Sequence, residues 1–293
     1  SILGPILFLI YINDLYSASA LTKFMFADDT AGLAANKDID TLVDFVNAEI
    51  KKLARWFRAN KMAVNVGKTK FIIFHTKGKA FNQSIQLTYD DNEPNENNPN
   101  LIHTIERYHS KHENSQCRAY KILGIHLDEL LSFDTHTSYI ISKLNRSLYC
   151  INRAKNFLTP AALKSLYFAL IHSHLTYCPI ITSCATNKNI NKISLIQKKA
   201  IRIISNKKYR EHTGPIFKSL NILPFIHLIS YAKLNFMHSV IHNYCPNSFI
   251  NIWTFNNERI DIPNLRNANA FTIPNPKIEL FKKSPLYTLP NLW

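Results

Sequence analysis

The residues best suited to chemistry are two adjacent aspartates, Asp28 and Asp29, within the stretch FMFADDT (24–30). Neighbouring carboxylates repel each other, and a hard divalent cation such as Mg²⁺ relieves this repulsion while also binding substrate phosphates. The preceding residues are apolar, so the pair is expected on a rigid element, which suits metal geometry. An Asp-Asp pair is also common at ordinary turns, and this short pattern alone does not separate the two interpretations.

The elements expected to hold this pair are a hairpin and the helices on either side of it. Residues 23–34 predict two short strands around a tight turn, with both aspartates at the bend. Residues 5–17 predict a short apolar helix. Residues 38–60 predict the clearest helix, because apolar residues recur there at spacings of three and four, and an aspartate can cap its start.

The rest of the chain changes from strands to helices near residue 135. Further strands are predicted at 62–66, 71–75, 85–89, 101–106 and 120–127, with a GKT turn at 67–69 and the polar break DDNEPNENNPN (90–100) as a loose hairpin tip. Helices are predicted at about 136–157, from Thr159 onward, at 188–205 and at 224–243. The last stretch, 247–293, is rich in Asn and Pro and is expected to be extended or partly disordered.

The net charge of +15 is concentrated in one segment. Residues 135–245 contain 15 Lys or Arg and a single acidic residue, Glu211, which indicates either an anionic partner or a well-solvated face. Nucleic acid is favoured over a membrane surface, because no basic amphipathic terminal helix stands out. The candidate phosphate-binding residues are Lys143, Arg146, Arg153, Lys155, Lys198, Lys199 and Arg202.

Four motifs stand in order along the chain: SILGPILFLIYINDL (1–15), FMFADDT (24–30), NVGKTKFIIF (65–74) and YKILGIHLD (120–128). This succession resembles the later motifs of reverse transcriptases, most closely those of non-LTR (LINE-type), jockey-like retrotransposons. The segments LKSLYFALIHSHLTY (163–177), LIQKKAIRII (195–204) and SPLYTLPNLW (284–293) resemble downstream parts of the same proteins more loosely. The resemblance therefore covers nearly the whole chain.

The fold that this resemblance implies is of the α+β class. It is a partial right-hand polymerase palm, an antiparallel sheet with helices, followed by an all-helical thumb-like module. The implied divisions are a partial palm (1–80), a variable insertion or long hairpin (81–116), a primer-grip strand region (117–134), a basic helical thumb-like module (135–246) and an extended Asn- and Pro-rich tail (247–293).

The activity that the resemblance implies is that of an RNA-directed DNA polymerase with two Mg²⁺ ions. Its partners would be an RNA template, namely the element's own RNA, a DNA primer and deoxynucleoside triphosphates. Asp28 would bind both ions, Asp29 would support the site less directly, and Lys68 would approach the pyrophosphate. The implied primer-grip residues are Lys121, Leu123 and Gly124. At Gly124 the missing Cβ lets the backbone approach the primer end.

The family places its first catalytic aspartate and its fingers before the Ser-x-Leu-Gly-Pro motif, with which this sequence begins. The chain is therefore expected to be a fragment that is inactive alone. The alternative function is that of a catalytically dead, nucleic-acid-binding remnant of a degenerate element. The sequence encoded upstream of Ser1 would separate the two, because an intact frame favours an active parent enzyme and stop codons favour the remnant.

The remaining metal-binding or reactive side chains are expected to be structural. His109, His112 and Cys117 form only part of a zinc set, without an evident fourth ligand. Cys178 and Cys184 are expected to be buried small apolar residues. Five irregularly spaced cysteines favour a reducing compartment. The resemblance implies that the parent element acts inside the cell, in the cytoplasm, the nucleus or both, and the location of this chain stays open. Neither a membrane nor a stable protein partner is indicated.

Overall fold

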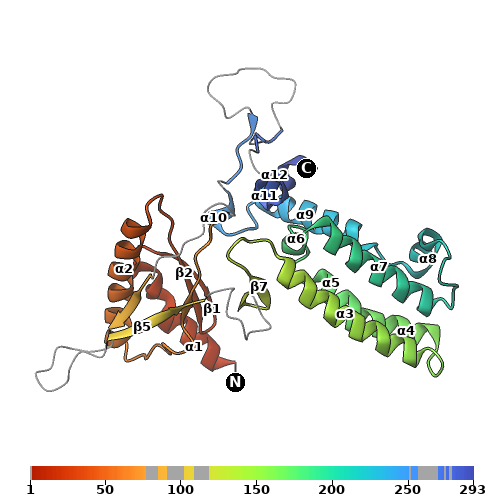
Figure 1. Ribbon diagram of the computed structural model, residues 1–293, viewed down its shortest axis with the longest axis horizontal. Coiled ribbons are helices and arrows are strands. Elements are labelled where there is room, and N and C mark those ends of the chain that lie inside the picture. The colour runs from red at the N-terminus through yellow and green to blue at the C-terminus, as the bar shows by residue number, and fades with distance from the viewer. Residues whose placement is uncertain are drawn as a thin grey trace, which may run out of the picture. The chain divides into compact units, whose positions relative to one another are not determined.

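In the computed structural model, the described residues are 2–76, 85–90, 102–108, 119–250, 252–256, 270–273, 275–276 and 279–293. The chain divides into two compact units, Ser1–Asn114 and Ser115–Trp293 (Figure 1). No helix within the described ranges is long and apolar enough to cross a membrane.

The first unit contains a hairpin, two helices and a small sheet. Its elements are α1 (Leu3–Ile12), the 3-10 turn η1 (Asn13–Ser17), β1 (Thr22–Phe26), β2 (Asp29–Leu33), α2 (Ile39–Ala59), β3 (Lys70–Phe71), β4 (Leu87–Asp90) and β5 (Ile102–Arg107). The predicted order of helix, hairpin and helix is confirmed. Asp38 caps α2, because its carboxylate accepts a hydrogen bond from the amide of Thr41 at 2.8 Å.

The prediction of a strand at 62–66 is wrong. The amide of Met62 donates to the carbonyl of Phe57 at 2.8 Å and so closes the end of α2, instead of pairing in a sheet. Val64 and Val66 still pack against the core of the unit, which explains the apolar alternation that suggested a strand. The strand predicted at 71–75 is also mostly wrong, since pairing is limited to β3.

The core of the first unit lies between α2 and the three-stranded sheet, whose order is β3-β5-β4. β4 and β5 pair antiparallel with Leu87 opposite Ile105, which confirms the predicted hairpin. Its tip, 91–101, lies outside the described residues. The segment expected to be a variable insertion therefore contributes to the core, whose buried residues are Ala54, Leu87, Tyr89 and Ile105.

The second unit is a helical assembly preceded by a short hairpin. Its elements are β6 (Tyr120–Ile122), β7 (Ile125–Leu127), α3 (Asp134–Ala154), α4 (Pro160–Tyr167), the π-helical turn η2 (Phe168–His172), α5 (Ser173–Thr176), α6 (Pro179–Thr182), α7 (Asn187–Ile204), α8 (Thr213–Leu220), α9 (Phe225–Ile241), α10 (Asn247–Ile250), α11 (Glu279–Lys283) and α12 (Pro285–Leu292). The predicted helices are confirmed as α3, α4, α7 and α9. The sequence analysis did not predict the short helices α6 and α8.

A buried amide lies in the core of this unit, among α3, α4, α7 and α9. Gln197, 1% exposed, donates to the hydroxyl of Tyr167 and to the carbonyl of Leu223, both at 2.9 Å, and accepts from the amide of Phe225 at 2.7 Å. Burial raises the pKa of Tyr167 to about 12, so its hydroxyl stays neutral. The side chain of Gln197 therefore connects α7 to α4 and to the start of α9.

The expectation that 247–293 is extended or partly disordered is wrong for three short helices, whereas the described residues 252–255 and 270–273 form no helix. α10, α11 and α12 form there, and the indole nitrogen of Trp253 donates to the carbonyl of Leu286 at 3.1 Å. Apolar residues of this tail are buried against α9, an interaction that the local sequence pattern does not show. The cluster consists of Met237, Val240, Trp253, Phe271 and Leu289.

Replacing Gln197 with Leu tests the role of the buried amide. We expect the free energy of unfolding to fall by on the order of 3 kcal/mol, because a hydroxyl, a carbonyl and an amide lose their partner, at about 1–3 kcal/mol each. Urea unfolding followed by far-ultraviolet circular dichroism measures the change. The matched control is Lys199→Leu on the exposed face of the same helix, with little expected effect. An unfolding midpoint of Gln197→Leu equal to that of the unsubstituted chain would contradict the role.

Candidate active site and nucleic-acid interface

The two aspartates lie at the tip of the β1–β2 hairpin. Phe26 pairs with Asp29, so the turn between the strands consists of Ala27 and Asp28 alone. The sequence predicted both aspartates at the bend, but only Asp28 lies in the turn, and Asp29 is the first residue of β2. Ala27 has a φ of 53°, in the left-handed region that costs about 1 kcal/mol or more for a residue with a Cβ. The carboxylates of Asp28 and Asp29 are both exposed.

This pair of carboxylates suits one hard divalent cation. Mg²⁺ commonly binds through one or two carboxylates and keeps several waters, which exposed and adjacent carboxylates allow. Among the described residues, no group of three or more His, Cys, Asp or Glu could hold a metal ion. The described site thus offers two carboxylate ligands from one hairpin.

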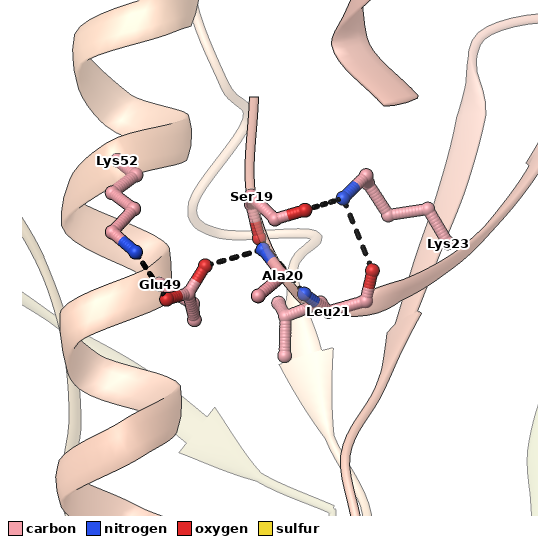
Figure 2. Close-up of polar contacts among 6 residues, drawn as sticks. All are labelled: Ser19, Ala20, Leu21, Lys23, Glu49 and Lys52. Atoms are coloured by element: carbon pink, nitrogen blue, oxygen red, sulfur yellow. Dashed lines mark hydrogen bonds and ion pairs between the residues drawn. The ribbon is translucent and has the colours of Figure 1, made fainter. Parts of the chain in front are cut away.

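The base of the hairpin is fixed to α2 by a buried carboxylate (Figure 2). Glu49, 3% exposed, accepts a hydrogen bond from the amide of Ala20 at 2.5 Å and forms an ion pair with Lys52 at 2.6 Å. These two donors, Lys52 first, hold the pKa of Glu49 below its usual range, so the carboxylate stays charged. The chain therefore enters β1 at a position set by α2.

A second polar contact folds the chain around the start of β1 (Figure 2). Lys23, 7% exposed, donates to the carbonyls of Ser19 and Leu21, the latter at 3.0 Å. Its ammonium also lies 5.6 Å from the ring centre of Tyr16. On β2, a Cβ at Gly32 would lie 3.1 Å from the side chain of Leu21, so glycine permits close packing across the hairpin.

Lys68 lies in the predicted GKT turn, as an exposed residue. The amide of Lys68 donates to the backbone carbonyl of Asn65 at 3.0 Å and to its side-chain oxygen at 3.1 Å. The turn is therefore held by Asn65. Within the described residues, no hydrogen bond or ion pair joins Lys68 to the aspartates.

The proposed primer-grip residues lie on a hairpin rather than on the single strand predicted at 120–127. Ile122 pairs with Ile125, and the two residues between them, Leu123 and Gly124, have φ values of 45° and 83°. Two positive φ values are typical of the tight turns that match the twist of paired strands. Glycine adopts this conformation freely, whereas Leu123 does not, and this explains why the sequence pattern suggested a continuous strand.

Tyr177 holds the tip of this second hairpin, and the sequence analysis did not identify it. Its hydroxyl donates to the carbonyl of Leu123, and its ring lies 3.4 Å from the position of a Cβ on Gly124. Glycine at 124 is therefore favoured by its positive φ, and the ring of Tyr177 packs beside it. Lys121 is exposed on β6, opposite the buried His126.

Two buried histidines lie together here, His126 on β7 of this hairpin and His136 on α3. The amide of His126 lies 3.5 Å from Nδ1 of His136, which accepts its hydrogen bond, and the two rings are stacked with centres 6.1 Å apart. Burial lowers the pKa of His136 to about 4, with a smaller contribution from His126, and burial also lowers the pKa of His126. Both side chains are therefore uncharged at neutral pH.

The basic residues predicted to bind phosphate differ in exposure. On α3, Arg146 and Arg153 are exposed, as is Lys155 at its end, while Lys143 is half-buried with its ammonium 5.5 Å from the ring centre of Tyr139. On α7, Lys199 is exposed and Lys198 half-buried. Arg202 is half-buried, and its Nε donates to the carbonyl of Glu211 at 2.9 Å. Arg202 therefore has a backbone partner of its own, and its binding to phosphate stays a prediction.

The units also differ in charge. Ser1–Asn114 contains 13 Lys or Arg and 13 Asp or Glu, so the whole net charge of +15 lies in Ser115–Trp293. Lys188 and Lys192 of α7 are exposed cations of this second unit that were not predicted as phosphate-binding candidates. Their spacing of four residues on a predicted helix could have identified them.

The remaining candidates are of less interest for function. Cys184 is buried and Cys178 half-buried, and burial raises the pKa of both thiols, which suits packing rather than reactivity. The partial zinc set, His109, His112 and Cys117, lies outside the described residues.

Two curated proteins are similar to this chain. It is 25% identical over 235 residues to the RNA-directed DNA polymerase from mobile element jockey of Drosophila melanogaster, and 25% identical over 242 residues to the protein of the same name from Drosophila funebris. Each match covers 76% of this chain and 23% of the relative, so the chain spans about a quarter of the length of these relatives. No protein-family model and no solved structure matches the chain. The resemblance carried by the four motifs is confirmed, and the chain is a homologue of the RNA-directed DNA polymerases of jockey mobile elements.

Proposed function

We propose that this chain is part of an RNA-directed DNA polymerase and supplies one hairpin of its metal-binding active site. The observation that carries the proposal is the pair of exposed carboxylates, Asp28 and Asp29, at the tip of a hairpin whose base is fixed to α2 by Glu49. Such fixed carboxylates suit phosphoryl transfer, in which positioning and charge neutralisation supply most of the catalysis. The substrates are a deoxynucleoside triphosphate and a DNA primer on an RNA template.

In this proposal the two aspartates have different roles. Asp28 lies in the turn and is the main metal ligand, while Asp29, paired with Phe26 on β2, supports it. Mg²⁺, when bound, supplies positive charge that stabilises the charge developing on the transferred phosphoryl group. Lys68 is exposed and suits the pyrophosphate side of the site.

The first unit corresponds, in this proposal, to part of a polymerase palm, and the helices of the second unit to a thumb. The basic charge of the second unit supports a role in holding the template and primer through their phosphates. The hairpin of Lys121, Leu123 and Gly124, fixed by Tyr177, is the proposed primer grip.

The 293-residue chain by itself should not extend a primer. Two metal ions in productive geometry need carboxylates on both sides, and the described residues offer Asp28 and Asp29 from one hairpin. The measurement is extension of a labelled primer on an RNA template with Mg²⁺. Synthesis above the level of an Asp28→Ala control would show that the chain assembles a complete site by itself.

A longer chain that includes the family's upstream half should be active and should depend on Asp28 more than on Asp29. Asp28→Ala should lower the turnover rate on the order of 10³-fold, as expected when a transition-state charge stabiliser is lost. Asp29→Ala should have a smaller effect, because Asp29 lies on the paired strand. Asp44→Ala, an exposed carboxylate on α2, is the matched control and should leave the rate unchanged. Near-normal turnover of Asp28→Ala would refute the assignment.

Binding of the chain to a primer–template duplex should weaken steeply with salt. For six to eight phosphate contacts, the slope of log K against log salt concentration should be roughly −4 to −7. Replacing both Lys198 and Lys199 with Ala should make that slope shallower by about one to two units. The control is the double substitution Lys37→Ala and Lys51→Ala, two exposed lysines of the first unit. Equal slopes for the two double variants would assign the α7 lysines to solvent.

A further inference from the structure

We infer that the outer face of α3 is a binding surface for single-stranded nucleic acid, on which aromatic rings stack with bases and arginines bind phosphates. The inference rests on the proposed function, which makes nucleic acid the anion that binds this unit. It adds that the bound nucleic acid is single-stranded and that one face of α3 binds it. The surface, named here the α3 stripe, consists of Arg146, Tyr149, Arg153 and Phe157.

The α3 stripe follows from the period of the helix. Arg146, Tyr149 and Arg153 are spaced by three and four residues, so they lie on one face of α3. The opposite face is buried, with Leu144 and Ile151 at 0% exposure. Phe157 lies three residues after the end of α3, in a turn in which its amide donates to the carbonyl of Ala154 at 3.0 Å.

The aromatic residues of the stripe have large exposed rings. Tyr149 is 64% exposed and Phe157 is 86% exposed. A ring so exposed gains little from folding, because the hydrophobic contribution grows with the area removed from water. Both rings are therefore available to a ligand with a flat, partly apolar face, and a nucleobase has such a face.

The charge of the stripe selects an anionic ligand. Along α3 the only acidic residue is Asp134, and its carboxylate already accepts from Thr186 at 3.0 Å and from Asn189 at 2.9 Å. Within the described residues, no ion pair neutralises Arg146 or Arg153. The two arginines are separated by about 10 Å along the helix axis.

A single strand fits this surface better than a duplex or a membrane. Bases in a duplex have their faces covered by stacking, so the rings of Tyr149 and Phe157 can meet bases only where the strand is unpaired. A membrane-binding helix instead carries a continuous apolar face. The outer face of α3 has amides beside the rings, from the exposed Asn145 and Asn152, which can donate hydrogen bonds to base edges.

The test measures binding of the 293-residue chain to a fluorescent single-stranded RNA of about 12 nucleotides and to a duplex of equal length. Replacing Tyr149 and Phe157 together with Leu keeps both side chains apolar but removes the rings. We expect this variant to bind the single strand at least about tenfold more weakly, with little change for the duplex. Tyr149→Phe keeps a ring at that position and should therefore bind the single strand as the unsubstituted chain does. The matched control is Tyr231→Leu, an exposed tyrosine of α9 that is 62% exposed, with no expected effect.

Circular dichroism of each variant checks that the fold is unchanged, which is expected because the replaced side chains are exposed. Equal single-strand affinity of the Leu double variant and the unsubstituted chain would refute the inference, as would equal losses for single strand and duplex. Vesicles with anionic lipids provide a further comparison, and ring-dependent binding to vesicles with no binding to RNA would also refute it. Polymerase activity of the longer chain is a separate measurement, so loss of the stripe and loss of the proposed function are distinguishable.

Discussion

The hydrogen bond between Glu49 and the amide of Ala20 is the constraint on which the candidate active site depends. β1 buries little apart from Lys23, and Phe24 and Phe26 are 57% and 65% exposed. The hairpin therefore gains little of its position from apolar packing. Instead, the charged and buried carboxylate of Glu49 on the amphipathic helix α2 fixes the start of the hairpin. The paired strands β1 and β2 then connect this fixed point to the two aspartates.

The two units answer opposite electrostatic demands. The hairpin places two carboxylates side by side at an exposed turn, whereas the helical unit carries all of the net positive charge. Inside the helical unit, the buried amide of Gln197 meets three partners, and Tyr167 is neutral because its pKa is about 12. The exposed cations Arg146, Arg153 and Lys199 therefore lie on helices whose core holds no charge at these two buried positions.

Much of the fold could be predicted from the sequence where local pattern and tertiary environment agree. α2 and the β1–β2 hairpin belong to this group, because helical period, an N-cap and turn chemistry all act within a few residues. Prediction failed where a distant partner decides the conformation. Leu123 adopts a positive φ at a turn fixed by Tyr177, which lies 54 residues further along the chain. For the candidate site, the residue types and their order were predictable, whereas the anchor Glu49 looked like one of many polar residues on a helix.

The packing of the tail on α9 sets an order of events during synthesis. Met237 and Val240 leave the ribosome well before Leu289, yet all three share one buried cluster. Until Leu289 emerges, the apolar residues at the end of α9 lack this partner. The cluster of the first unit, Ala54, Leu87, Tyr89 and Ile105, contains no residue beyond Ile105. Because synthesis runs from the N-terminal to the C-terminal end, the core beside the aspartates can therefore form before the tail packs on α9.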